Sequence, residues 1–289
     1  MKRLSALTLA AVLAITMLAL AGCGQDKSQD PDRSSMGDMR ISFIDVGKGD
    51  CILLQYGESA ALIDTGYDDT SDEVLSSFQK LGVSHLDCLI ITHYDSDHVG
   101  GLRAIGKALA IDVVYLPGYE GGDKNYKTVM SAIEDLGLNA QPVTEEQRLK
   151  LGDAELDVFP TSLKYIPGSK GEEGNDNDLS LVVTLTGDGG SYLFAGDLEE
   201  DGIAAFLGAG HGRFDVLKMP HHGKKASNTD ELIEDVEPQI AIITDSEDDP
   251  ADKKTLKLLK NNGVDVYRTS ASGTITVQND GAGRYSVIE

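Results

Sequence analysis

The sequence predicts an α/β sandwich in which two mixed β-sheets pack face to face and helices cover their outer faces. Short apolar runs separated by glycine-containing breaks recur from residue 39 onward, and helical patterns alternate with them in both halves of the chain. With 289 residues and 40% hydrophobic composition, the chain is large enough to bury a substantial core. The sequence contains no repeat of about 20 to 50 residues, so a solenoid is not expected.

The first half of the predicted domain starts with strands and continues with alternating helices and strands. Apolar or alternating runs predict strands at residues 40–46, 50–56, 60–66, 85–92 and 112–117. Apolar residues at helical spacing, with glycine stops, predict helices at residues 68–82, 99–110 and 126–137. Strands that alternate with helices in this way are typical of a parallel sheet.

The second half repeats this order. Strands are predicted at residues 154–160, 179–187, 191–197, 214–220, 238–244, 264–270, 273–278 and 284–289. Helices are predicted at residues 199–210, 228–236 and 252–263. A sandwich of two mixed sheets with helices outside would bury all of these apolar strands.

Residues 1–22 are predicted to be a lipoprotein signal peptide that lies outside the fold. A short basic start precedes an apolar stretch of signal-peptide length, and the letters LAGC that end at Cys23 resemble a bacterial lipobox. Lipid on Cys23 would anchor the chain to the extracytoplasmic face of the cell membrane, and residues 23–38 have the polar composition of a flexible tether. An ordinary secretory signal or an uncleaved anchor helix is the alternative. Residues 39–289 then form the folded domain.

The internal cysteines bear on the core, and the net charge bears on the substrates that the surface can bind. Cys51 and Cys88 lie in apolar strand-like runs and are predicted to be small core residues, with a disulfide as the alternative. The formal net charge is −23. An acidic surface repels long polyanions and anionic lipid, so a nucleic-acid substrate would require a local basic patch.

Four of the six histidines fall in two short clusters, and each cluster directly follows a predicted strand. The stretch ITHYDSDHVGG contains His93, Asp95, Asp97 and His98. In an extended segment the first three side chains project from one side, and His98 can reach the same space as the chain turns into a helix. Imidazole and carboxylate groups are ligands for zinc, manganese or iron, so the spacing predicts a metal site.

A polar loop is the alternative for each of these residues taken alone. Asp97 by itself would be expected to cap the following helix, but four ligating side chains in a row after a buried strand favour a metal site. His85 and His211 have no acidic partner at motif spacing, so a surface or packing role is expected for each. The acidic stretch 245–249 is expected to be a solvated loop.

The ordered set of motifs resembles the metallo-β-lactamase superfamily, whose hallmark at this place is His-x-His-x-Asp-His. The other matching stretches are FIDVGKGDCILLQ, ALIDTG, NDLSLVV, LFAGD and LKMPHHG, in that order. The resemblance covers most of residues 39–289. The resemblance is closest to the hydrolase domain of ComEC-type competence proteins, because these proteins carry an aspartate where this chain has Asp95. The predicted signal peptide implies that this chain is a free-standing lipoprotein form of that domain. The resemblance implies an αββα sandwich with a dinuclear metal site between the sheets.

The resemblance also implies a ligand set. The six implied metal ligands are His93, Asp95, Asp97, His98, Asp197 and His222. The first two would bind one ion, Asp97, His98 and His222 would bind the other, and Asp197 would bridge the two.

Further residues acquire roles only through the resemblance. His221 and Asp97 are the predicted catalytic residues, with His221 on the substrate phosphate, and the roles of His221 and His222 could be exchanged. The residues expected to support the ligands or contact the substrate are Asp64, Asn177, Ser180 and Lys224. The letters HHGKK depart from the usual HHGS of the family, which weakens the assignment of a substrate contact at that position.

The aspartate at position 95 bears on the metal and on the reaction. Three ionised aspartates leave two divalent ions near a net charge of +1, and the harder ligand set makes manganese competitive with zinc. A bound water whose pKa falls from about 15.7 to about 7 would supply hydroxide at neutral pH. The expected reaction is therefore hydrolysis, with phosphodiesters as the leading substrates.

DNA is the leading phosphodiester by resemblance, and four basic residues near the motifs are expected to supply local positive charge: Lys218, Lys224, Lys225 and Arg103. A solvated loop is the alternative for the last two lysines. Other candidate functions are hydrolysis of envelope-polymer phosphodiesters, hydrolysis of β-lactams, and metal binding without catalysis. No long apolar segment follows the predicted signal, so transport is not predicted.

Overall fold

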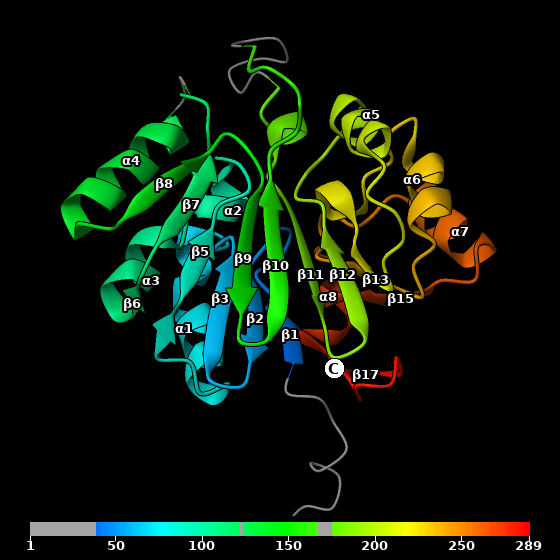
Figure 1. The fold of residues 1–289 in the computed structure, drawn as a ribbon, viewed down its shortest axis with the longest axis horizontal. Coiled ribbons are helices and arrows are strands. Elements are labelled where there is room, and N and C mark those ends of the chain that lie inside the picture. Colours follow the sequence, from blue (N-terminus) through cyan, green and yellow to red (C-terminus); the bar gives the residue numbers. More distant parts are fainter. Residues whose placement is uncertain (1–38, 122–123, 167–174) are drawn as a thin grey trace, which may run out of the picture. The chain divides into compact units, whose positions relative to one another are not determined.

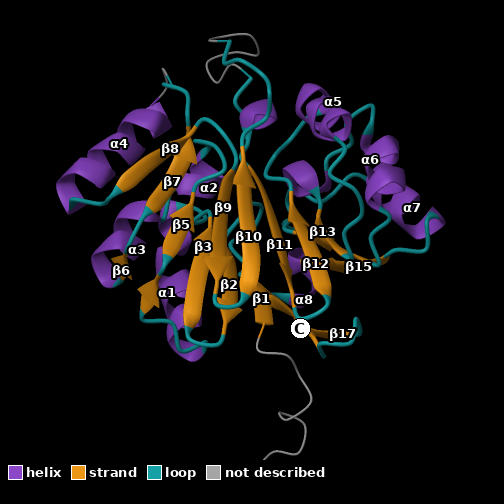
Figure 2. Ribbon diagram, in the orientation of Figure 1, coloured by secondary structure: helices purple, strands orange, loops and turns teal. Residues whose placement is uncertain are grey.

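The computed structural model describes residues 39–121, 124–166 and 175–289. The predicted signal peptide and tether, residues 1–22 and 23–38, lie outside the described residues. Within the described part, two mixed sheets pack face to face and helices cover the outer face of each (Figures 1 and 2). This arrangement confirms the predicted αββα sandwich. None of the described helices combines the length and the apolar character needed to cross a membrane.

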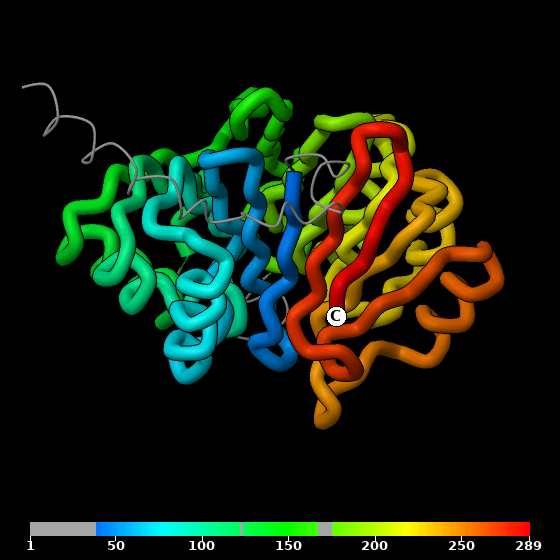
Figure 3. The backbone as a smooth tube through the Cα atoms, turned by 90° about the horizontal axis from the view of Figure 1, so that it is seen from below, coloured from blue at the N-terminus to red at the C-terminus, as the bar shows by residue number. Residues whose placement is uncertain are grey.

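In the described residues, the first sheet has eight strands in the order β17-β16-β1-β2-β3-β5-β7-β8. Their bounds are Met39–Phe43 (β1), Ile52–Tyr56 (β2), Ser59–Ile63 (β3), Cys88–Ile90 (β5), Val114–Pro117 (β7), Ala140–Val143 (β8), Ile275–Asn279 (β16) and Tyr285–Ile288 (β17). Pairing is antiparallel from β17 to β3 and parallel from β3 to β8. The C-terminal hairpin therefore returns to lie beside β1, as Figure 3 shows.

In the described residues, the second sheet has seven strands in the order β15-β14-β13-β12-β11-β10-β9. Their bounds are Gln147–Leu151 (β9), Ala154–Phe159 (β10), Val182–Gly187 (β11), Gly190–Phe194 (β12), Val216–Lys218 (β13), Ile240–Ile243 (β14) and Asp265–Arg268 (β15). The pairs from β12 to β15 are parallel, and the others are antiparallel. Two short strands, β4 (His85–Leu86) and β6 (Ala110–Ile111), pair separately.

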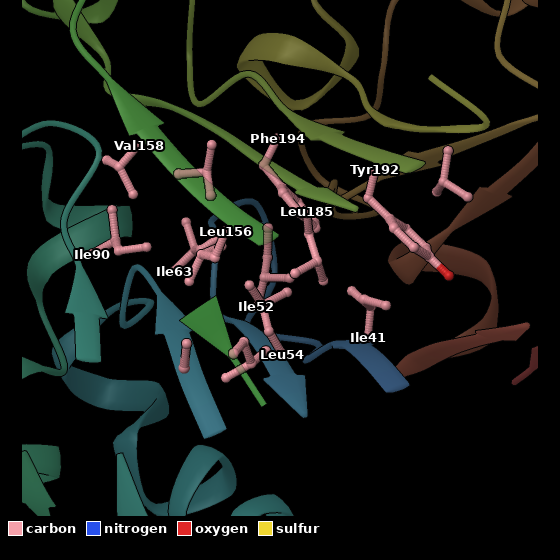
Figure 4. Close-up of a cluster of buried hydrophobic side chains, with 14 of the residues drawn as sticks. Ile41, Ile52, Leu54, Ile63, Ile90, Leu156, Val158, Leu185, Tyr192 and Phe194 are labelled. Carbon is pink, nitrogen blue, oxygen red and sulfur yellow. The ribbon is translucent and has the colours of Figure 1, made fainter. Parts of the chain in front are cut away.

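The core between the sheets consists of the inward side chains of both. Figure 4 shows Ile52, Leu54 and Ile63 of the first sheet facing Leu156 and other apolar residues of the second. Because successive side chains on a strand point to opposite faces, the residues between these ones pack under the helices instead. Cys51 and Cys88 are buried and form no disulfide, which confirms the core interpretation.

Helices cover the outer faces because their apolar residues recur at helical spacing. The helices over the first sheet are α1 (Ser71–Lys80), α3 (Leu102–Ala108) and α4 (Lys124–Leu136), and Val74, Phe78 and Ile105 are among their buried residues. The helices over the second sheet are α5 (Glu200–Ala209), α6 (Thr229–Val236) and α7 (Lys253–Asn261). Short elements complete the described part: α2 (Ser96–Val99), α8 (Thr269–Ser272), and the 3-10 turns Asp68–Thr70, Asn177–Leu179 and Pro220–Gly223.

The structure departs from the predicted elements in a few places. Strands β8 and β9 were not predicted, because β8 contains Pro142 and is largely exposed while β9 alternates between exposed and partly buried residues. The helix predicted at 99–110 is divided by Gly100 and Gly101. A Cβ on Gly100 would lie 2.4 Å from the backbone nitrogen of Asp68, so the glycine pair lets the loop after β3 approach closely.

Candidate metal centre

The predicted site residues gather at the carboxyl ends of parallel strands. Asp64 follows β3, the motif that begins at His93 follows β5, Asp197 follows β12, and His222 follows β13. The last two strands belong to the second sheet, so the site lies where loops of both sheets meet. The carboxyl edge of parallel strands is where open α/β sheets hold ligands.

The side chains that the sequence proposed as ligands converge closely. His222 Nε2 lies 3.1 Å from Asp197 Oδ2 and 3.4 Å from Asp97 Oδ2, and His98 Nε2 lies 3.4 Å from Asp197 Oδ1. The rings of His93 and His98 are 4.1 Å apart between centroids. These distances put five side chains around one small volume.

Two overlapping groups within this set have the dimensions of metal sites. One contains His93, His98 and Asp197, and the other contains Asp97, His98 and His222, each with ligand atoms within 4.8 Å of one another. His98 belongs to both groups, although the sequence assigned it to one ion. Asp95 belongs to neither group. Its carboxylate lies at the edge of the site, 3.7 Å from His93 Nε2, and 23% of its side chain is exposed.

The donor atoms that face this volume are the ones that a metal ion requires. The Nε2 atoms of His93, His98 and His222 and the Oδ1 atom of Asp197 are all buried and have no hydrogen-bond partner of acceptable geometry. A buried polar atom without a partner costs about 1–3 kcal/mol, so four at one point call for a ligand that satisfies them together. Imidazole nitrogen and carboxylate oxygen fit divalent zinc or manganese.

The opposite nitrogen of each imidazole is held by the protein. Asp64 Oδ2 lies 2.7 Å from His98 Nδ1, Thr92 Oγ1 lies 3.0 Å from His93 Nδ1, and Thr244 Oγ1 lies 3.1 Å from His222 Nδ1.

Of two further predicted supporting residues, Ser180 lies next to ligands, whereas Asn177 bonds to Glu199. Ser180 Oγ accepts the backbone N–H of Asp197 at 3.0 Å and lies 3.4 Å from His93 Nδ1, and the Asn177 amide donates to Glu199 at 3.3 Å. Partners of the imidazole Nδ1 atoms, such as Ser180 at His93, fix the tautomer and the orientation of metal-binding histidines.

Left-handed backbone conformations occur at three site residues. Asp64 has φ 57°, His221 has φ 47° and His222 has φ 52°, all in a region that side chains other than glycine seldom adopt. Such conformations cost on the order of 1–3 kcal/mol and persist where the surroundings hold them. Asp64 is held by three hydrogen bonds, from Thr92 N, Thr92 Oγ1 and the His98 ring. Of the two neighbouring histidines, His222 is fully buried, whereas the His221 side chain is 24% exposed and lines a pocket above the site.

A polar pocket of about 420 Å³ opens over the site. Its lining residues are Lys48, Tyr67, Asp95, Ser96, Asp97, Asn125, Asn175, Asp176, Asn177, Glu199 and His221. Among these described residues, Lys48 is the single lysine or arginine. Burial and the nearby Asp97 carboxylate raise the pKa of Tyr67 to about 12, so its hydroxyl remains protonated and can donate a hydrogen bond.

Comparison with known proteins identifies the family. Residues 44–243 match the model of the metallo-beta-lactamase superfamily. The chain belongs to this superfamily. Members of this superfamily are generally metal-dependent hydrolases, and the fold usually binds two metal ions, in agreement with the two ligand groups.

Two competence proteins are similar to this superfamily member. ComE operon protein 3 of Bacillus subtilis (strain 168) is 30% identical over 268 residues, which cover 85% of this chain and 33% of the relative. Competence protein ComA of Neisseria gonorrhoeae is 25% identical over 256 residues, which cover 86% of this chain and 33% of the relative. The chain thus spans about a third of the length of these relatives. The predicted relation to competence proteins is confirmed, and the free-standing lipoprotein form stays a prediction.

Solved structures agree with the metallo-beta-lactamase fold. The metallo-beta-lactamase fold protein YhfI from Bacillus subtilis superposes with a TM-score of 0.54 and 14% identity. The match covers 82% of this chain and 98% of that chain. At this identity the likeness shows the fold alone.

The carboxylates of the candidate metal centre stabilise positive charge on the groups beside them. Burial alone would raise the pKa of Asp197, but His222, His98 and Lys218 hold it well below its ordinary value. Burial alone would lower the pKa of His98, but Asp197 and Asp64 raise it well above its ordinary value. Each carboxylate therefore stabilises a neighbouring cation, whether that cation is a proton on a histidine or a metal ion.

Lys218, which was expected to supply positive charge to the substrate, forms a buried network behind the ligands with Asp50 and Thr244, for which no role was predicted. Lys218 pairs with Asp50 and stands 3.5 Å from Asp197 Oδ1, and Thr244 donates to Asp50 Oδ1 at 2.6 Å. Burial alone would lower the pKa of Lys218, but Asp50 and Asp197 raise it. A lysine at the end of the buried run FDVLKMP was the signal in the sequence, because an unpaired ammonium is seldom buried.

The four basic residues expected to form a positive patch do not form one. Each pairs with an aspartate: Lys218 with Asp50, Lys224 with Asp249, Lys225 with Asp230, and Arg103 with Asp135. Lys218 is also buried, and none of the four lines the pocket above the metal centre. The expected local positive charge is thus neutralised, and Lys224 does not reach the pocket lining.

The acidic stretch 245–249 is not wholly a solvated loop. Asp245 is buried, where it accepts from Arg268 Nε at 2.9 Å and from Ser270 Oγ at 2.7 Å. Asp249 is the residue that fits the expectation better, since its side chain is 48% exposed, although it pairs with a lysine.

His85 and His211, the two histidines outside the site, contact an aspartate and two phenylalanine rings, respectively. The parallel pairing of β4 with β6 brings Asp112 to 2.9 Å from His85 Nε2, a partner that motif spacing did not show. His211 stacks on Phe159 and Phe206, with ring centroids 4.3 Å and 4.9 Å away, which confirms a packing role.

Proposed function

We propose that this protein is a metal-dependent phosphodiesterase, anchored by lipid on Cys23 to the extracytoplasmic face of the cell membrane, and that its substrate is DNA or a related phosphodiester. The observation that carries the proposal is the convergence of three unpartnered imidazole nitrogens and an unpartnered carboxylate oxygen under a polar pocket of about 420 Å³. The relation to competence proteins supports a nucleic-acid substrate.

The proposed site would hold two divalent ions. His93 with Asp95 would bind one ion, Asp97 and His222 the other, and Asp197 and His98 lie within reach of both groups. The aspartates make the ligand set hard, which favours manganese alongside zinc. Two such ions would supply a hydroxide nucleophile at neutral pH and stabilise the charge that develops on the phosphoryl oxygens.

The chain's own residues would position the phosphodiester over that site. Lys48 lines the pocket, and its ion pair with Asp249 is long at 3.7 Å, so its ammonium is available to a nonbridging phosphate oxygen. His221 lines the same pocket, 4.0 Å from Asp197 Oδ2, and burial lowers its pKa, so its neutral ring can donate one hydrogen bond to the phosphate. The Asp97 carboxylate, at the base of the pocket, would orient the attacking water.

The direct test is metal analysis combined with hydrolysis of bis(4-nitrophenyl) phosphate in zinc and in manganese. The purified protein should bind two metal ions and release 4-nitrophenol, and Asp97→Ala should abolish turnover. Asp230→Ala, which alters a half-exposed aspartate outside the pocket, is the matched control and should retain activity. Absence of turnover with either metal would exclude the proposed phosphodiesterase activity. The remaining candidate function would then be metal binding without catalysis.

Parallel assays separate the other candidate activities. A chromogenic β-lactam and a 4-nitrophenyl phosphomonoester should be poor substrates compared with the diester. For the proposed location, Cys23→Ser should move the protein from the membrane fraction to the soluble fraction, and an unchanged distribution would count against lipid anchoring.

A further inference from the structure

A second pocket, of about 290 Å³, lies among loops at the same end of the strands as the metal centre. The segment after β7 contributes Pro117 and Tyr119, and the segment after β10 contributes Pro160, Leu163 and Tyr165. The rings of Tyr119 and Tyr165 stack on each other, with centroids 4.8 Å apart and planes inclined by 16°. The pocket is thus lined by flat aromatic and apolar groups. We call it the aromatic pocket.

The charge of the aromatic pocket is unlike that of the rest of the chain. The formal net charge is −23, and the pocket over the metal centre has four carboxylates in its lining. By contrast, the described residues that line the aromatic pocket include no aspartate or glutamate and one cation, Lys164. A site of this composition suits a flat, uncharged or electron-rich group attached to an anion.

The two pockets share a wall. Asn175 lines the pocket over the metal centre, and its side chain binds the carbonyl of Lys164 at 3.2 Å and the N–H of Ile166 at 2.8 Å, on either side of Tyr165.

Ring contacts continue the same wall. Tyr94, which precedes the pocket residue Asp95, contacts Tyr119 at 5.3 Å and Tyr126 at 5.0 Å, and Tyr126 follows the pocket residue Asn125. A substrate with its phosphate over the metal centre could therefore extend one neighbouring group into the aromatic pocket.

We propose that the aromatic pocket binds a nucleobase of the phosphodiester substrate whose scissile phosphate lies over the metal centre. This inference rests on the proposed phosphodiesterase function. Aromatic side chains accept any base by stacking, because every base has a π-face, so the pocket would favour nucleic acid without selecting sequence. Lys164 would lie near the backbone charge of the same strand.

A quaternary ammonium group, such as choline, is the competing occupant, since aromatic rings also bind such cations. Sites of that kind gain from nearby carboxylates, whereas this lining has a lysine and, among the described residues, no carboxylate. The charge therefore favours the nucleobase.

The test uses three substrates with the same leaving group: the 4-nitrophenyl esters of thymidine 5′-phosphate, of methyl phosphate and of phosphocholine. Tyr165→Ala should lower kcat/KM for the thymidine ester about tenfold, as loss of one stacking ring does, and leave the methyl ester unchanged. Tyr165→Phe should retain the thymidine rate, and Ile166→Ala, at an adjacent exposed residue, should change neither.

Each other outcome decides against the proposal. If Tyr165→Ala affects the thymidine and methyl esters equally, or affects neither, the pocket does not bind the base. If it affects the phosphocholine ester selectively, the occupant is a quaternary ammonium group.

A protein that hydrolyses none of the three esters would refute the phosphodiesterase function and not the pocket. In that case calorimetric titration with thymidine 5′-monophosphate decides the pocket by itself. Binding that is weakened about tenfold by Tyr165→Ala supports it, and equal or absent binding overturns it.

Discussion

Replacing Lys218 by methionine should destabilise the protein more than any change of an exposed ion pair. The Lys218 ammonium is buried, pairs with Asp50, stands 3.5 Å from Asp197 Oδ1, and donates to the carbonyl of Gly196 at 3.1 Å. Methionine has a similar shape but leaves two buried carboxylates without this cation. Breaking a buried ion pair from one side costs about 3–5 kcal/mol. Loss of the hydrogen bond to the Gly196 carbonyl, which keeps the His221 N–H as a partner, adds about 1 kcal/mol. Against a total stability of about 5–15 kcal/mol, this is a large fraction.

A double-mutant cycle isolates the pair itself. Asp50→Asn keeps an oxygen for the Thr244 hydroxyl, and it leaves Lys218 with Asp197 as a partner, so it should cost only about 1–3 kcal/mol. The double variant should cost less than the two single variants together by about 1–3 kcal/mol, because the second change removes a charge that the first left unpaired.

The assay is urea unfolding in EDTA, followed by far-ultraviolet circular dichroism because the chain has no tryptophan. Lys225→Met, which breaks a partly exposed pair with Asp230, is the control and should cost less than about 1 kcal/mol. The reasoning is refuted if Lys218→Met lies within 1 kcal/mol of the wild type, on the order of the control, or if the cycle is additive.

Three further predictions concern the pocket, the net charge and a packed histidine. Lys48→Gln should raise KM for a phosphodiester about fivefold with little change in kcat, whereas Lys224→Gln, whose partner is also Asp249 but which lies outside the pocket, should change neither. The kcat/KM for long DNA should increase as salt is raised from about 0.01 to 0.15 M, because salt screens the repulsion from a net charge of −23, and a decrease would reveal a basic contact instead. Burial lowers the pKa of His211 in the folded state, so its stabilising contribution is complete above about pH 6.5 and is lost as the pH falls through that value toward the lower folded pKa. His211→Phe should therefore lose less Tm than the wild type between about pH 7.5 and 5 in thermal melts, and parallel curves would contradict the assignment.

The fold could be predicted because most strands carry their burial in their own sequence. The run that became β14 is apolar and is bounded by breaks, and the structure buries all of its residues. Strand β9 was missed because it lies at the edge of its sheet and buries a side chain fully only at Leu151. Residues 269 and 270 were placed at the end of a strand, yet they begin the short helix α8 after β15. Local pattern therefore predicts central strands, and tertiary contacts decide the edges and the ends.

The site divides in the same way between local and distant information. His93, Asp97 and His98 are neighbours in the chain, so their alternation alone brought them together as a prediction. The pair of Asp50 with Lys218 joins a loop of the first sheet to a strand of the second, far apart in the sequence, and no spacing rule connects them. For the same reason the lysines near the motifs were expected to be available to substrate, although distant aspartates neutralise them.

The metal centre and the buried Asp50–Lys218 pair both join a loop of the first sheet to the second sheet. His98 follows β5 of the first sheet and Asp197 follows β12 of the second, so a bound ion would cross-link them. Asp50, in the loop between β1 and β2, reaches Lys218 on β13 across the same boundary. Ligands that converge only in the folded chain make metal binding part of the folding free energy. Removing Lys218 from the buried pair should therefore weaken stability and metal binding together.

Loss of Asp95, at the exposed edge, should weaken metal binding alone. Lys218 thus acts on the site through Asp197 and the position of the sheets, without touching the pocket.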